Sequence, residues 1–168
     1  MAIDPPRKRK GSRRYAARVY DLASAPCSSK GVAISADSPS TDSDLTREAI
    51  LRANSAFYEA FEAGDIDAMA AVWELSDRVA CTHPGWTTLR GWPQIGASWR
   101  AIFGNSPLQV IVTNHHVVIG ADMAFVTNDE NLIDTRGGGT VAALNAFAHD
   151  GQQWRMVAHH ASSVARTI

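Results

Sequence analysis

Cysteines and long apolar runs are both scarce in this sequence of 168 residues, and each scarcity excludes a class of protein. The two cysteines, Cys27 and Cys81, lie in a polar tail and in an apolar segment, which is no basis for a disulfide framework. No apolar run approaches the roughly 18 residues that span a bilayer, and no signal-peptide core follows the basic first residues. We therefore expect a cytoplasmic protein that is neither inserted in a membrane nor secreted.

Net charge is also nearly absent, at −1, so the chain as a whole has no electrostatic attraction to nucleic acid or anionic lipid. The positive charges are nevertheless uneven, because many lie in the first eighteen residues: Arg7, Lys8, Arg9, Lys10, Arg13, Arg14 and Arg18. This basic arm could contact nucleic acid or an acidic partner, or it could be a solvated tail. The second alternative is favoured, and a nucleic-acid partner is not expected.

Motifs of metal, nucleotide and nucleophile chemistry are missing as well. The six histidines include no pair at His-x-x-x-His spacing, and no Cys-x-x-Cys pair is present, so neither a metal site nor a cofactor is predicted. Arg136-Gly-Gly-Gly139 joins two predicted strands, which favours a hairpin over a phosphate-binding loop. There is no nucleophile elbow and no dinucleotide fingerprint. A reaction carried out here would therefore use side chains alone.

Composition divides the chain into two parts. Residues 1–42 are first basic and then rich in Ser, Ala, Asp, Pro and Thr. Such a segment cannot bury enough apolar surface to offset the entropy of ordering, so we expect a disordered tail. Residues 43–168 contain enough apolar residues for one folded domain.

The folded part is predicted to contain two helices, a short strand, a third helix and four longer strands. The first helix begins near Asp44 and ends at Gly64, and Asp65 caps the second. A strand at 77–82 and a helix at 91–105 follow. Turn residues then separate four strands, at 108–119, 123–134, 140–149 and 153–164. This order is typical of an α+β fold in which three N-terminal helices pack on a curved antiparallel sheet.

The segments 57–73, 79–86 and 91–92 resemble the opening of an NTF2-like domain, specifically of its SnoaL-like branch, which is related to the ketosteroid isomerases. The resemblance covers about residues 45–165. It implies an NTF2-like cone in which helices and sheet enclose an apolar pocket. It does not imply one reaction, because the same fold hosts enzymes, binding modules and dimerisation modules.

The resemblance also assigns positions to individual residues. It places His83 where ketosteroid isomerases have their general-base Asp, and it places Phe57 and Ala143 where they have the two groups that stabilise the oxyanion. Neither Phe57 nor Ala143 can donate a hydrogen bond from its side chain, so steroid isomerisation by that mechanism is not implied. Dehydration that uses His and carboxylate groups, as in scytalone dehydratases, is the closer analogy.

Strand alternation predicts which side chains face the pocket, because successive residues point to opposite sides of a sheet. A charged Arg155 is best left outside, which turns His160 inward and His159 outward in the last strand. At most one of His115 and His116 can reach the pocket. The other predicted inward residues are Val79, Cys81, His83, Ala124, Val126, Asn128, Glu130, Asn145 and Phe147.

These positions give a candidate site for general acid–base chemistry, since imidazole titrates near neutral pH and burial tunes it further. His83 is the expected base, with His160 or Glu130 as the partner acid. A second group is expected to hold a small apolar ligand, and it consists of Trp86, Trp99, Asn145, Phe57 and Tyr58.

Three hypotheses of function remain open at this point. The first is a cofactor-independent isomerase, cyclase or dehydratase that acts on a small apolar molecule. The second is a ligand-binding module that uses the same pocket without turnover. The third is a homodimerisation module whose outer sheet face, with Arg155, His159 and His115, forms the interface; it is compatible with either of the others.

Overall fold

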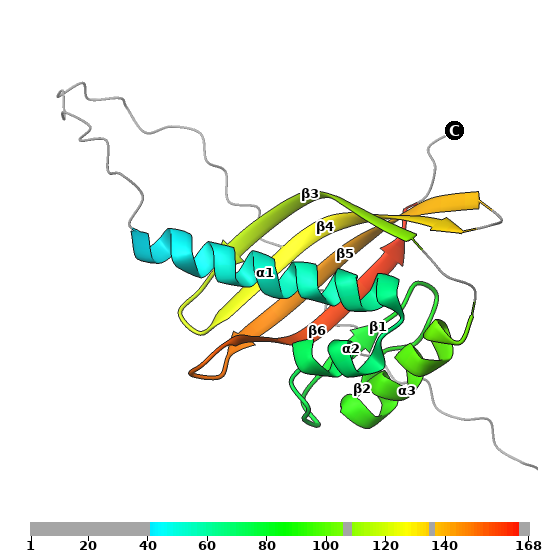
Figure 1. Ribbon diagram of the computed structural model, residues 1–168, viewed down its shortest axis with the longest axis horizontal. Coiled ribbons are helices and arrows are strands. Elements are labelled where there is room, and N and C mark those ends of the chain that lie inside the picture. Colours follow the sequence, from blue (N-terminus) through cyan, green and yellow to red (C-terminus); the bar gives the residue numbers. More distant parts are fainter. Residues whose placement is uncertain (1–40, 106–108, 135–136, 165–168) are drawn as a thin grey trace, which may run out of the picture. The chain divides into compact units, whose positions relative to one another are not determined.

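The computed structural model describes residues 41–105, 109–134 and 137–164. The predicted tail therefore lies outside the described residues, except that Thr41 and Asp42 already belong to the first helix. The described elements follow the predicted α+β order: three helices and a curved sheet of six strands. In Figure 1 helix α1 lies across one face of that sheet, and α2 and α3 lie near the short strands β1 and β2.

The helices begin and end for local reasons that the sequence already indicates. Helix α1 spans Thr41–Ala63, and Gly64 follows it with φ of 62°, a conformation that glycine adopts without strain. Helix α2 spans Ile66–Val72, and the carboxylate of Asp65 accepts hydrogen bonds from its first-turn N–H groups. Helix α3 spans Trp92–Phe103. The predicted helical hairpin at Gly64 and Asp65 is thus confirmed.

The six strands form one sheet in the order β2-β1-β6-β5-β4-β3. The long strands pair antiparallel, as predicted, whereas the short β1 runs parallel to β6. The predicted first strand is shorter than expected, and the two-residue strand β2 was not predicted. The bounds are β1 Ala80–Thr82, β2 Leu89–Arg90, β3 Gln109–Ile119, β4 Met123–Asp134, β5 Gly137–His149 and β6 Trp154–Ser163.

The main core lies between the helices and the inner face of the sheet. Helix α1 buries Ile50 and Phe57, helix α3 buries Ile95 and Trp99, and β5 buries Phe147. Each fully buried side chain of this size contributes roughly 1.5–3 kcal/mol to the burial term, so these residues fix the helices on the sheet. None of the described helices is long and apolar enough to cross a membrane.

A β-bulge in strand β6 reverses part of the predicted side-chain pattern. Phe147 pairs with Met156, but Ala146 pairs with Ala158, so Val157 has no partner residue on β5. One extra residue in a strand turns every later side chain to the opposite face. The prediction that His160 points inward and His159 outward is therefore wrong: His159 is 4% exposed, whereas His160 is exposed on the outer face.

Candidate functional site

A chain of buried polar side chains crosses the interior between α1 and the sheet, with Tyr58 at its centre. The Tyr58 hydroxyl donates a hydrogen bond to Oε1 of Glu130 at 2.7 Å. The hydroxyl oxygen of Tyr58 accepts hydrogen bonds from Nδ2 of Asn128 at 2.8 Å and from Nδ2 of Asn145 at 3.0 Å. The hydroxyl thus uses its one hydrogen and both lone pairs. Tyr58, expected from the sequence to help hold a ligand, is a buried junction of this network.

This network of hydrogen bonds continues from Asn145 to Asn54 on helix α1 and to His159 on strand β6. Nδ2 of Asn145 also donates to Oδ1 of Asn54 at 2.8 Å. Oδ1 of Asn145 lies 2.7 Å from Nδ1 of His159. Because an amide oxygen only accepts, His159 must carry its proton on Nδ1 in this arrangement. The amide of Asn145 therefore fixes both the orientation and the tautomer of His159.

His83 follows strand β1 and is held from helix α3. Its Nε2 lies 2.9 Å from Oγ of Ser98, and Oγ of Ser98 donates its one hydrogen to the carbonyl oxygen of Ile95 at 2.8 Å. Ser98 must then accept from His83, which places the proton of His83 on Nε2. The Sγ atom of Cys81 is 3.8 to 4.0 Å from the two ring nitrogens, a contact longer than an ordinary hydrogen bond.

Aromatic rings enclose the two imidazoles. The His83 ring meets Trp99 edge to face with centroids 4.7 Å apart, and Phe57 lies 5.0 Å from the His159 ring and 5.5 Å from Trp99. The centroids of His83 and His159 are 6.5 Å apart. Trp86 packs 5.1 Å from His83 but is 50% exposed, so it lies at the surface of this group.

Burial keeps both imidazoles neutral at physiological pH. It lowers the pKa of His83 to about 4. It lowers the pKa of His159 to about 3, to which the positive charges of the protonated His83 and His160 also contribute. A neutral imidazole has one donor and one acceptor nitrogen, so each of these rings has a lone pair on the nitrogen opposite its bound N–H.

The acidic groups shift in the opposite direction. Burial raises the pKa of Glu130 to about 7, although the hydrogen bond from Tyr58 lowers it. Burial, followed by the charge of Glu130, raises the pKa of Tyr58 far above its usual range and that of the Cys81 thiol to about 12. Glu130 is thus the acidic group of this interior that exchanges a proton near pH 7, and Cys81 stays a thiol rather than a nucleophilic thiolate.

Of the predicted site residues, the structure brings together His83, Trp99, Phe57, Tyr58, Glu130 and Asn145 in one interior, with Trp86 at its edge and His160 outside it. The sequence reasoning missed the parts played by Asn54, Ser98, Asn128 and His159. Asn54 precedes Tyr58 by four residues on one helix, so helical spacing could have found it. Among the described residues, three buried polar side-chain atoms have no hydrogen-bond partner: Nε1 of Trp73, Nε1 of Trp99 and Oδ1 of Asn128.

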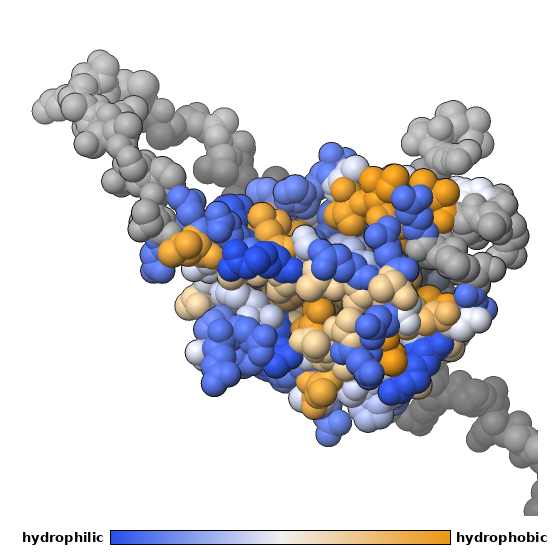
Figure 2. Space-filling model, viewed as in Figure 1, coloured by the Kyte–Doolittle hydropathy of each residue, from blue (hydrophilic) through white to orange (hydrophobic). Residues whose placement is uncertain are grey.

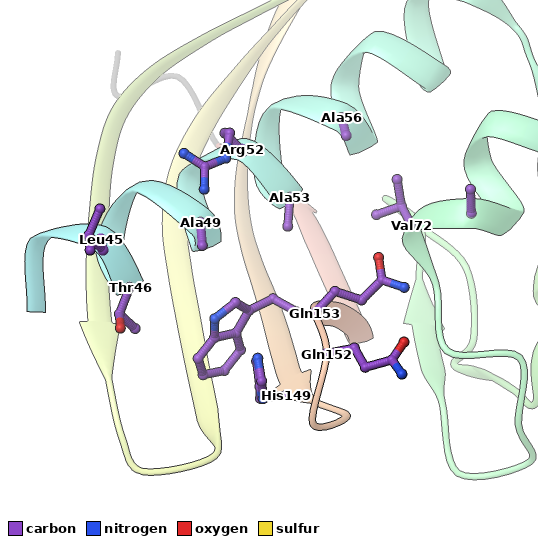
Figure 3. A pocket seen from close by; sticks show the side chains of 12 residues that line it. Leu45, Thr46, Ala49, Arg52, Ala53, Ala56, Val72, His149, Gln152 and Gln153 are labelled. Atoms are coloured by element: carbon purple, nitrogen blue, oxygen red, sulfur yellow. The ribbon is translucent and has the colours of Figure 1, made fainter. Parts of the chain in front are cut away.

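Several cavities lie on the folded domain, and one of them reaches this interior. One of about 440 Å³ lies between α1 and β3 and reaches the polar chain at Asn54 and Tyr58; His115 lines it. Another, of about 670 Å³, lies at the end of β4, β5 and β6. A third, of about 530 Å³, separates α1 from the β5–β6 hairpin (Figure 3). Among the described residues, no group of three or more His, Cys, Asp or Glu side chains could hold a metal ion.

Comparison with solved structures connects this chain to the NTF2-like family. An NTF2-like protein of Streptomyces avermitilis, provisionally assigned as a dehydratase, is 34% identical with a TM-score of 0.69 over 74% of this chain and 99% of its own. A protein of Thiobacillus denitrificans, provisionally assigned as a calcium/calmodulin-dependent protein kinase type II association domain, is 38% identical with a TM-score of 0.59 over 67% and 93%. An NTF2-like protein of Pseudomonas putida, of unknown function, is 17% identical and shares the fold, with a TM-score of 0.66 over 74% and 90%.

One curated relative and a family model complete the comparison. The F-box protein SKIP8 of Arabidopsis thaliana is 31% identical over 121 residues, which are 70% of this chain and 50% of the plant protein. The chain therefore spans about half the length of the curated relative it matches. The family model of the SnoaL-like domain matches residues 50–166. The predicted resemblance is confirmed, and the protein belongs to the SnoaL-like domain family, with an NTF2-like α+β fold.

Proposed function

We propose that the interior around His83 and Glu130 binds a small ring compound and moves a proton on it, without a cofactor, to remove water or to shift a double bond. The observation that carries this proposal is that one buried interior holds both a neutral imidazole in a fixed tautomer and a carboxyl group whose pKa is about 7. A base and an acid with different proton affinities in one water-poor site are what such chemistry requires.

His83 is the general base of the proposed reaction. Its Nε2–H is bound to Ser98, so the lone pair on Nδ1 takes the proton. That proton comes from a carbon next to a carbonyl group of the substrate, and the electrons of the broken C–H bond form a carbon–carbon double bond. The rings of Trp99 and Phe57 pack around the two imidazoles and give this base apolar surroundings.

Glu130 is the general acid. In its protonated form it gives a proton to a hydroxyl group on the neighbouring carbon, whose C–O bond breaks, and water leaves. The proton taken by His83 later returns to Glu130, which restores both groups. The provisional assignment of the 34% identical Streptomyces avermitilis relative as a dehydratase supports water loss over a double-bond shift.

The test is a thermal-shift screen of apolar ring compounds, followed by turnover assays of each compound that binds. A ligand that binds only the native state must raise the melting temperature. We expect the shift to shrink in His83→Ala and turnover to fall to background, because the base is lost. His116→Ala, on an exposed histidine of β3, is the matched control and should behave as wild type. Ligands that bind equally well but are never consumed would instead favour a non-catalytic binding module.

A second function, homodimerisation, rests on the outer face of the sheet. Val118, Phe125 and Leu144 are large apolar side chains that are 37 to 39% exposed there. Val118 on β3 pairs with Phe125 on β4, and Leu144 on β5 pairs with Thr127, two residues along β4 from Phe125. Figure 2 is viewed from the side on which α1 covers the sheet, so this outer face is turned away from the viewer there. The Thiobacillus denitrificans relative, provisionally assigned as an association domain, supports an assembling role.

We expect the protein to form a dimer through this face at protein concentrations of tens of micromolar. A charge in the centre of an apolar interface is costly to bury, so Phe125→Glu should shift the dimer to a monomer. The matched control, Asp122→Asn in the exposed β3–β4 turn, should leave the dimer intact. Static light scattering checks both, and a monomeric wild-type protein would contradict this second function.

A further inference from the structure

The cavity of about 440 Å³ between helix α1 and strand β3 is a second place where a ligand can bind. Strand β3 is the last strand in the order of the sheet, so this cavity opens at the edge of the sheet. Neither His83 nor Glu130 lines it. Its volume lies within the range of about 300–1,000 Å³ that is usual for small-ligand sites.

Two carboxylates of α1, those of Glu59 and Glu62, line this cavity. Oε1 of Glu62 accepts a hydrogen bond from the backbone N–H of Val110 on β3 at 2.9 Å, which holds this carboxylate between the helix and the strand. None of the ion pairs within the described residues includes either glutamate, and no described lysine or arginine lines the cavity. Like charges three residues apart on a helix are neighbours that repel each other, so a cation bound here would relieve the repulsion.

A buried donor without a partner lines the same cavity. Asn54 is 4% exposed, and its Oδ1 accepts the hydrogen bond from Asn145. Its Nδ2 has no hydrogen-bond partner in the part of the chain that the structure describes. Because a buried N–H group without an acceptor is unfavourable, a ligand that brings an oxygen to Nδ2 of Asn54 gains a hydrogen bond there.

Apolar side chains complete the wall of the cavity, from Leu51 on α1 and from Val110 and Val112 on β3. Glu59 and Glu62 follow Asn54 by five and eight residues, which places them about 7.5 and 12 Å further along the helix axis. The buried donor and the two carboxylates are therefore separated along the helix. A ligand that reaches both needs a short apolar chain with a polar group at each end.

We propose that this cavity binds a small alkylammonium compound that carries an oxygen at its other end. The ammonium group donates charge-assisted hydrogen bonds to Glu59 and Glu62, and the oxygen accepts one from Nδ2 of Asn54. An anionic ligand is repelled by the same two carboxylates. This site does not depend on the acid–base chemistry proposed for His83 and Glu130, so either can fail without the other.

The test titrates the full chain at pH 7 with three probes of equal size, 5-amino-1-pentanol, n-hexylamine and 1,5-pentanediol, and follows backbone ¹H–¹⁵N shifts. The amino alcohol should bind about fivefold more tightly than hexylamine, which lacks the oxygen, and about tenfold more tightly than the diol, which lacks the charge. The largest shifts should fall on α1 and β3. A merely apolar cavity would favour hexylamine. Tightest binding by hexylamine, equal binding by the diol, or no binding by the amino alcohol would each overturn the inference.

Variants locate the two ends of the ligand. The double variant Glu59→Gln and Glu62→Gln should weaken binding of the amino alcohol about tenfold, and its glutamine at 62 keeps an oxygen for the N–H of Val110. Glu48→Gln, the matched control, removes an exposed carboxylate of α1 that does not line the cavity and should bind as wild type. Asn54→Leu should abolish the preference for the amino alcohol over hexylamine. Should Asn54→Leu fail to fold, the three probes on the wild-type protein still decide, and unchanged affinity in the double variant would overturn the inference.

Discussion

Acidification from pH 6.5 to pH 4.5 should lower the free energy of unfolding of this protein by about 3 kcal/mol. The cause is a difference in proton binding between the folded and unfolded chains at three buried groups. His83 and His159 have folded pKa values of about 4 and about 3 against an ordinary value of 6.5. Glu130 has a folded pKa of about 7 against 4.5.

The three groups act with opposite signs in this pH window. Each histidine is neutral when folded and protonated when unfolded, so the unfolded state gains two protons and is favoured as the pH falls. Glu130 is protonated when folded and ionised when unfolded, so it favours the folded state at the acidic end of the window. The net difference is one proton, which corresponds to about 1.4 kcal/mol per pH unit.

Glu130→Gln isolates the carboxyl group. Glutamine keeps an oxygen that can accept the Tyr58 hydrogen bond but cannot titrate, so the loss of stability over the same window should increase to about 5 kcal/mol. Urea unfolding at pH 4.5, 5.5 and 6.5 measures the slope. Glu59→Gln, an exposed carboxyl on the same helix as Tyr58, should keep the wild-type slope. A variant slope equal to that of wild type would show that the pKa of Glu130 is not raised in the folded state.

Much of the fold could be predicted because its signals are local. A glycine with positive φ and an aspartate cap mark the hairpin between α1 and α2 whatever the rest of the chain does. The inward side of β4, from Ala124 to Glu130, followed from alternation because that stretch pairs with β5 without interruption. Strand β2 could not be predicted, since two residues carry no periodicity and pair only because the chain brings them beside β1.

The candidate site was harder to predict because it depends on register. A charged Arg155 correctly indicates the outer side at the start of β6, but the bulge at Val157 reverses the pattern before His159. No residue type announces that bulge, so the choice of His160 failed for a reason that one sequence cannot reveal. The role of Ser98 was hidden in the same way, since a serine becomes a hydrogen-bond partner only when packing places it opposite His83.

Replacing Tyr58 by Phe should lower the free energy of unfolding by about 3 kcal/mol, although only one oxygen atom is removed. The hydroxyl is the single partner of Nδ2 of Asn128 and of Oε1 of Glu130, so both become buried groups without a hydrogen bond. Asn145 is less affected, because its Nδ2 also donates to Asn54. The phenyl ring keeps its edge contact with Phe57, whose centroid lies 4.9 Å away, so packing loss is small. Urea unfolding at pH 7 gives the difference.

A second substitution separates lost hydrogen bonds from lost packing. Asn128→Leu in the Tyr58→Phe protein removes the amide donor that has lost its partner, together with the unpartnered Oδ1 of the wild type. If orphaned polar groups cause the destabilisation, the double variant must be more stable than the sum of the single effects predicts, by about 1 kcal/mol or more. Ser55→Ala, which removes an exposed hydroxyl from the same helix, should change stability by less than about 0.5 kcal/mol. If the two stability changes are strictly additive, the destabilisation by Tyr58→Phe does not come from an unpartnered Asn128. The polar side chains from Glu130 to His159 would then not form one connected network.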